Sequence, residues 1–142
     1  MTGKLLARLA TAALATLGGL CAAAAQDKTL SIELNDATDV GGACRLVFVA
    51  LNGTGVVIEK TAFDVVTFDA AGKVGQSLTF QFGRLPVGKT RVVQFDLAGQ
   101  SCTGISRLLV NDVSDCAVDG KASDLCMDAL ATKTRAAIEF GL

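Results

Sequence analysis

The stretch SLTFQFGRLPVGKTRVVQFDL, residues 77–97, predicts two β-strands joined by a loop. Apolar residues occupy every second position at its start and again over residues 93–97. Successive side chains of a strand point to opposite faces, so this period of two is typical of strands with one buried face. Residues 83–88 hold two glycines and the only proline of the chain, which favours a loop.

The rest of the chain repeats this organisation, with turn residues between short apolar or alternating segments. No long helical period is present, and residues 123–130 are the exception, where Ser123 could cap a short helix. About seven strands at regular spacing predict an immunoglobulin-like antiparallel β-sandwich in a single domain, residues 26–142. The further expected strands are residues 30–34, 44–51, 56–68 with a bulge near 59–60, 105–110 and 133–140.

The first 25 residues predict a signal peptide. Lys4 and Arg8 precede an apolar run, and small residues at Ala23 and Ala25 fit a cleavage site before Gln26. The run is too short to span a bilayer as a helix. Cys21 follows the large Leu20 rather than a small residue, so we expect ordinary cleavage without lipidation. A periplasmic or secreted location follows.

Composition narrows the function classes. The chain has no His, Trp or Tyr, which removes the commonest general base, the commonest transition-metal ligand and the preferred stacking platforms. Of the 13 basic residues, Lys4 and Arg8 belong to the signal peptide, which leaves 11 against 14 acidic residues and a net charge of −3. This charge gives no reason to expect nucleic acid or an anionic membrane as a partner.

Four cysteines of the mature chain predict two disulfides. Their spacing fits neither a structural zinc site nor a thioredoxin-like pair. Cys44 opens the second expected strand and Cys102 precedes the sixth, and these two strands run the same way, so their starts share one end. Cys116 lies beyond the far end of the sixth strand, near Cys126 in sequence. The expected pairing is therefore Cys44–Cys102 and Cys116–Cys126.

A cluster of carboxylates suggests two possible functions, calcium binding and catalysis. The segment from Asp112 to Asp128 could gather calcium, or Asp115 and Asp119 could act as the acid and base of an enzyme. The spacing matches no EF-hand loop, and Lys121 lies in the middle. We therefore expect a solvated loop that binds no metal tightly. The acidic residues considered are Asp112, Asp115, Asp119, Asp124 and Asp128.

Two further segments leave alternatives open. The triplet from Asn52 to Thr54 matches a glycosylation acceptor and equally a hairpin turn, and we favour the turn. Val47, Val49 and Leu51 fall on the strand face opposite Leu46 and Phe48. That face is either covered, the default for a central strand, or an exposed binding patch.

The middle third of the chain resembles a known family. Residues 65–74, VVTFDAAGKV, followed by LPVGKT at residues 85–90 and by Phe95, look like the FxLYD-type domain of secreted bacterial proteins. The resemblance implies an immunoglobulin-like sandwich and brings no catalytic residues or cofactor.

Together these features predict a secreted or periplasmic module with a structural or protein-binding role. We expect no enzyme and no cofactor, and neither Ser101 nor Ser106 has an evident His or Lys base nearby. An unpaired edge strand could accept a strand from a protein partner.

Overall fold

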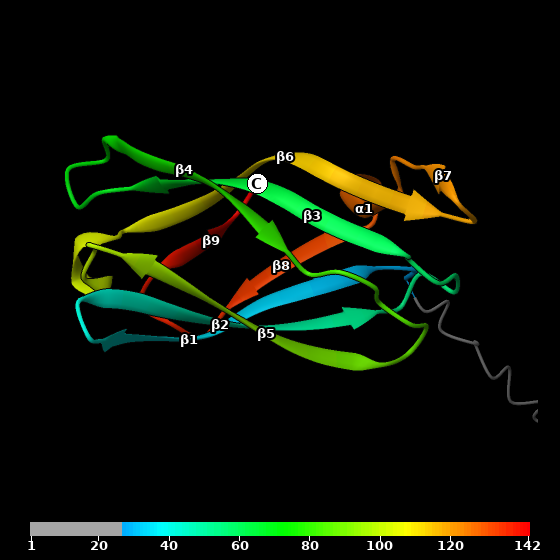
Figure 1. The fold of residues 1–142 in the computed structure, drawn as a ribbon, viewed down its shortest axis with the longest axis horizontal. Coiled ribbons are helices and arrows are strands. Elements are labelled where there is room, and N and C mark those ends of the chain that lie inside the picture. Colours follow the sequence, from blue (N-terminus) through cyan, green and yellow to red (C-terminus); the bar gives the residue numbers. More distant parts are fainter. Residues whose placement is uncertain (1–26) are drawn as a thin grey trace, which may run out of the picture.

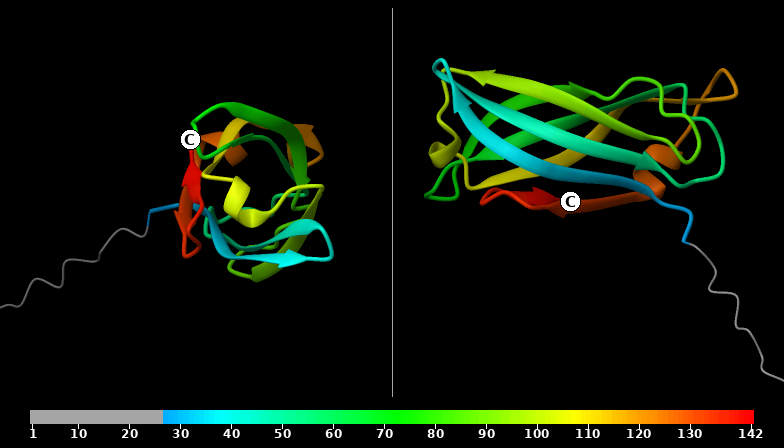
Figure 2. Two further views of the ribbon diagram at one scale, coloured as in Figure 1. Left: turned by 90° about the vertical axis from the view of Figure 1, so that its left-hand side faces the viewer. Right: turned by 90° about the horizontal axis from the view of Figure 1, so that it is seen from below.

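A computed structural model describes residues 27–142 as a two-layer β-sandwich (Figure 1). Gln26 and the predicted signal peptide lie outside the described residues. Nine strands form two sheets, as the all-β prediction requires. Seen from one end, the two sheets enclose a common interior, and the C-terminal strands run along one side of it (Figure 2).

Each sheet is built around antiparallel neighbours. Sheet I has the order β5-β2-β1-β8, and sheet II has the order β4-β3-β6, with β7 and β9 both pairing with β6. In sheet I the strands are β1 (Leu30–Val40), β2 (Ala43–Asn52), β5 (Thr90–Ala98) and β8 (Leu130–Thr134). In sheet II they are β3 (Lys60–Phe68), β4 (Val74–Gln81), β6 (Arg107–Val118), β7 (Lys121–Ala122) and β9 (Glu139–Gly141).

The C-terminal segment corrects the prediction of one antiparallel strand over residues 133–140. It divides into β8, which pairs in parallel with β1, and β9, which pairs in parallel with β6. The Thr134 hydroxyl accepts the Ala136 N–H and donates to the Ile138 carbonyl, so it stabilises the bend between the two strands. Because the chain changes sheets here, it buries Ile138 and closes one side of the sandwich.

The third strand is shorter than predicted. It begins at Lys60, and residues 56–58 leave the sheet instead of extending it across a bulge. Ile58 pairs with Leu85 of the loop after β4, and both side chains are fully buried. A contact between two loops therefore replaces the expected start of the strand.

The predicted helix is present as a single turn, α1 (Leu125–Asp128). Asp124, rather than Ser123, stands at the N-cap position, and its side chain makes no capping bond. The Ser123 hydroxyl accepts the Leu125 N–H at 3.2 Å, so it still holds the start of the turn. Cys126 is fully buried and ties α1 to β6.

Phe48 lies at the centre of the core between the sheets. Its ring contacts four other rings, with centroids between 5.2 and 5.9 Å away. Tilted and edge-on ring contacts of this kind stabilise a core beyond their buried area. The four partners, which come from both sheets and the loop after β4, are Phe80, Phe82, Phe95 and Phe140.

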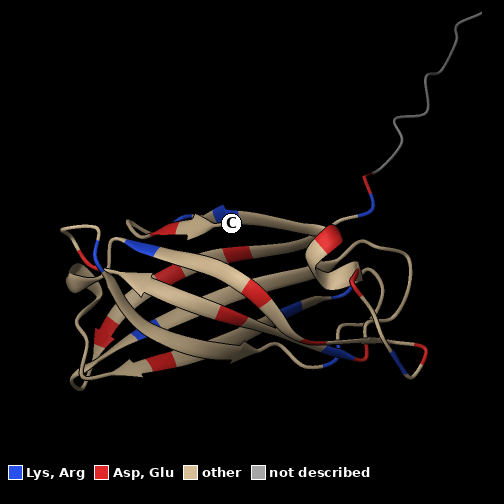
Figure 3. Ribbon diagram, turned by 90° about the horizontal axis from the view of Figure 1, so that it is seen from above, with Lys and Arg blue, Asp and Glu red and all other residues tan. Residues whose placement is uncertain are grey.

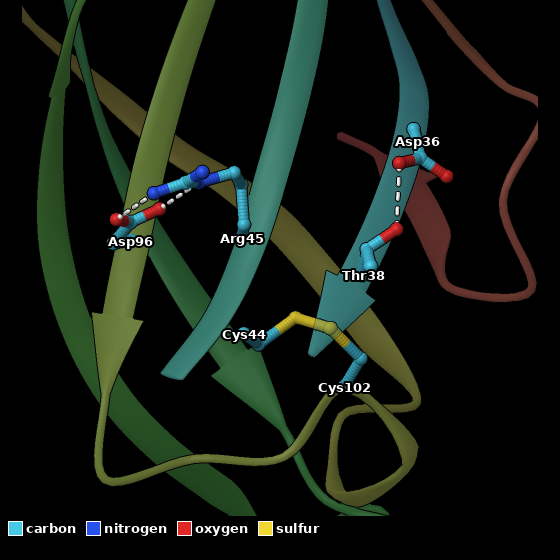
Figure 4. A network of polar contacts seen from close by, with 6 residues as sticks. All are labelled: Asp36, Thr38, Cys44, Arg45, Asp96 and Cys102. Atoms are coloured by element: carbon cyan, nitrogen blue, oxygen red, sulfur yellow. Dashed lines mark hydrogen bonds and ion pairs between the residues drawn. A yellow bond between two sulfur atoms is a disulfide. The ribbon is translucent and has the colours of Figure 1, made fainter. Parts of the chain in front are cut away.

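Two disulfides fasten opposite ends of β6. Cys44 joins Cys102 in the short 3-10 turn before β6, with Cα atoms 4.8 Å apart (Figure 4). Cys116 near the end of β6 joins Cys126, with Cα atoms 6.0 Å apart. Both pairings are those that the strand directions predict. Among residues 27–142, no helix is long and apolar enough to cross a membrane.

Candidate functional site

The outer face of sheet I carries an exposed apolar patch. Val49 of β2 lies directly opposite Val92 of β5, and Val47 and Leu51 are the next positions of β2 on the same face. Val92 is 61% exposed and Leu51 is 40% exposed. Val47 and Val49 are half-buried, so the face is only partly covered, which corrects the default expectation of burial for a central strand. We call Val47, Val49, Leu51 and Val92 the apolar patch.

The patch continues onto the loop between β4 and β5. Val87 of this loop is 48% exposed, and together with Leu51 it lines a hollow of about 490 Å³. Backbone of Gly53 and Gly55 forms part of the same wall. Apolar surface thus extends from the strands to the end of the sandwich that holds α1.

The β5 strand next to the patch has a free edge. In the described part of the chain it pairs with β2 alone. Gly99 donates its N–H to the Gly42 carbonyl, which fixes the alternation of bonded and non-bonded pairs along the two strands. By that alternation Thr90, Val92 and Gln94 direct their backbone N–H and C=O groups away from β2. These groups are open to a further strand.

Basic side chains gather at the start of β5. Arg84, Lys89 and Arg91 line a solvent-open hollow of about 320 Å³ together with Pro86 and Thr90. The sequence-based prediction considered only the net charge of −3 and missed this group. The sequence does contain a pattern that indicates this group, because no acidic residue occurs from position 70 to position 95, a stretch with four basic residues.

Asn52 holds the loops that carry this surface. Its side chain is fully buried, and its amide nitrogen donates to the carbonyls of Val56 and Leu85, each at 2.8 Å. Its amide oxygen accepts both the N–H and the hydroxyl of Thr54. The segment is the turn that the sequence favoured, and a buried, fully bonded amide is no acceptor for a glycan in the folded domain.

An ion pair lies on the same outer face. Arg45 donates two hydrogen bonds of 2.8 Å to the Asp96 carboxylate across β2 and β5 (Figure 4). These hydrogen bonds, aided by the guanidinium charge, hold the pKa of Asp96 below its usual range and raise that of Arg45. The bidentate geometry fixes β5 against β2 beside the apolar patch.

The lowered pKa of Asp96 predicts a loss of stability in acid. A carboxyl whose pKa is lower in the folded state contributes stability above its ordinary pKa of about 4, and this is lost as pH falls through the folded pKa. We expect Asp96→Asn to lower the urea midpoint at pH 7 and to differ less from wild type as pH falls below about 4. Urea unfolding across pH measures both. Asp128→Asn, which removes a carboxylate without a hydrogen-bond partner among the described residues, serves as the control. A constant difference between Asp96→Asn and wild type at every pH would contradict this assignment.

The structure disperses the acidic residues that suggested calcium or an enzyme. Asp115 lies 3.9 Å from the Lys60 ammonium, and Asp112 accepts the N–H of Val113. Asp115 and Asp124 line one shallow hollow, while Asp119 lies in the turn between β6 and β7 outside it. Among residues 27–142, no three Asp, Glu or Cys side chains are grouped as a metal site. Figure 3 shows charged residues of both signs in the loops at the α1 end.

Comparison of the chain with family models, curated proteins and solved structures gives no match. The resemblance of residues 65–95 to FxLYD-type domains therefore stays a prediction. The described geometry supplies the evidence on function: an apolar patch, a free strand edge and a basic hollow that adjoin at one end of sheet I.

Proposed function

We propose that this chain is a periplasmic or secreted β-sandwich module that binds a protein partner through the apolar patch and the free edge of β5. Residues 1–25 act as the signal peptide in this proposal, and the mature protein begins at Gln26. Two disulfides support a location outside the cytoplasm, because such bonds persist in oxidising compartments.

The exposed apolar patch beside an unpaired strand edge carries the proposal. An extended segment of a partner can form main-chain hydrogen bonds with β5 while its side chains lie against Val92 and its neighbours. The edge strand β4 of sheet II is less suited to pairing. Its ladder with β3 is interrupted by a bulge, and bulges blunt sheet edges against further strands.

Site-specific photo-crosslinking in cells of the source organism tests this role. We expect p-benzoylphenylalanine in place of Val92 to give a discrete protein adduct upon irradiation. The same probe in place of Val74, which is 68% exposed on the β4 edge, is the matched control and should give none. Mass spectrometry of the adduct identifies the partner.

Two results would contradict the proposal. One is the absence of any adduct from position 92 in folded, oxidised protein. The other is the same set of adducts from positions 92 and 74, since that indicates collision with abundant proteins and not docking on sheet I.

A further inference from the structure

The hollow at the start of β5 has the character of an anion site. Two arginines and one lysine line it, from a segment of only eight residues, 84–91. Gly83 has a φ of +72°, which a side chain would strain, and an added Cβ would lie 3.7 Å from the Arg91 guanidinium. The positive φ is what favours glycine here, since a Cβ at 3.7 Å would make only an ordinary contact with that arginine.

The three cations are unneutralised within the described domain. The ion pairs of residues 27–142 join Arg45 to Asp96, Lys60 to Asp115 and Arg135 to Glu33, and none uses the bases of this hollow. Arg91 donates through Nη1 to the Arg84 carbonyl at 3.0 Å. This single bond orients the guanidinium and leaves its remaining N–H donors available to a carboxylate.

The position of the hollow relates it to the free edge of β5. Because β5 begins at Thr90, a strand that paired antiparallel with it would end beside the hollow. Apolar side chains of that strand would lie near Val92, and its last residues would meet Arg84, Lys89 and Arg91. The charge therefore selects among the extended segments that the edge could accept.

We propose that this hollow is a carboxylate-binding subsite, and that the partner of sheet I presents an extended segment with an apolar part followed by acidic residues. The inference rests on the proposed protein-binding function and adds the chemistry of the partner. Rim charges of this kind govern partner choice and association rate more than total affinity.

Titration of the oxidised mature domain with two synthetic peptides tests the subsite. The probes are acetyl-Thr-Val-Thr-Val-Glu-Glu-amide and its Gln-Gln counterpart, followed by the backbone amide shifts of ¹⁵N-labelled protein at low salt. We expect the acidic peptide to shift the amides of residues 84–91 and of Val92 and Gln94, with an affinity at least fivefold above that of the neutral peptide. The difference should fall as salt is raised.

Matched variants distinguish specific binding in the hollow from a nonspecific effect of positive charges on the domain. Arg84→Gln with Lys89→Gln leaves Arg91 and its bond to the Arg84 carbonyl in place, and should abolish the preference for the acidic peptide. Lys73→Gln with Lys133→Gln removes the same charge elsewhere and should preserve it. Equal affinity of the two peptides, loss of the preference in both variants, or stronger shifts with inorganic phosphate than with the acidic peptide would each overturn the proposal.

The same spectra distinguish this inference from the function on which it rests. Shifts at Val92 and Gln94 with both peptides, without any preference for glutamate, leave the docking edge intact and refute the carboxylate subsite. Shifts confined to residues 84–91 with the acidic peptide support the subsite and refute docking along β5.

Discussion

Replacing both Cys44 and Cys102 with alanine is expected to lower the free energy of unfolding by roughly 4 kcal/mol. The bridge spans 58 residues, and a cross-link of that span restricts the unfolded chain by about this amount in the loop-entropy model. The Cys44 side chain is fully buried and Cys102 packs against the core, so the loss of the bridge also weakens packing at this end of the sandwich. Single domains have about 5–15 kcal/mol of total stability, so the variant should approach the limit of folding at 37 °C.

The matched control is the pair Cys116 and Cys126, also replaced with alanine. Their bridge spans 10 residues, and the same model gives roughly 3 kcal/mol. Urea unfolding of the oxidised proteins measures both changes. If the short bridge proves the more important of the two, the entropic account of the long one is wrong. Reduction of the wild-type protein should reproduce the combined loss.

The second large effect is expected from Asn52→Ala. The substitution leaves the Leu85 carbonyl and the Thr54 N–H without their partner in buried surroundings. An unsatisfied buried polar group costs about 1–3 kcal/mol, so we expect a total loss of about 3 kcal/mol. Asn111→Ala on an exposed position of β6 is the control and should change the stability by less than about 0.5 kcal/mol.

The Asn52 variant also bears on the candidate site. Because Asn52 ties Val56 and Leu85 together, its loss should release the loop that carries Arg84 and Lys89. Hydrogen exchange at the amides of residues 84–89 should accelerate at temperatures where the variant is still folded. Unchanged exchange there, with lowered global stability, would show that the Ile58–Leu85 contact holds the loop by itself.

The sequence predicted most of the strands and both disulfides, because strands follow from the alternation of side chains and the disulfides follow from strand direction. The alternation of residues 93–97 is visible in five residues, since the side chains of a strand change face at every residue. The pairing of Cys44 with Cys102 follows from two strands that run the same way and share an end. Neither inference requires knowledge of which sheet a strand joins.

The C-terminal segment shows a feature that these rules do not predict. Residues 133–140 alternate as one strand would, yet they divide between two sheets as β8 and β9. The division depends on hydrogen bonds to distant partners, since the backbone N–H of Arg135 donates to the Leu34 carbonyl and that of Glu139 to the Ser106 carbonyl. A period of two reports which residues face inward, and it carries no information on the neighbouring strand.

The sequence by itself determined the all-β class, most strand positions and the cysteine pairing, because each follows from the spacing of apolar residues, turn residues and cysteines along the chain. Tertiary structure alone decided that Val92 and Leu51 stay exposed, since the same valine-rich pattern suits a covered or an open sheet face. It also brought Arg84, Lys89 and Arg91 around one hollow and set it beside the free edge of β5. Exposure and grouping are properties of what lies across space from a residue, and that is fixed only when the sheets pack.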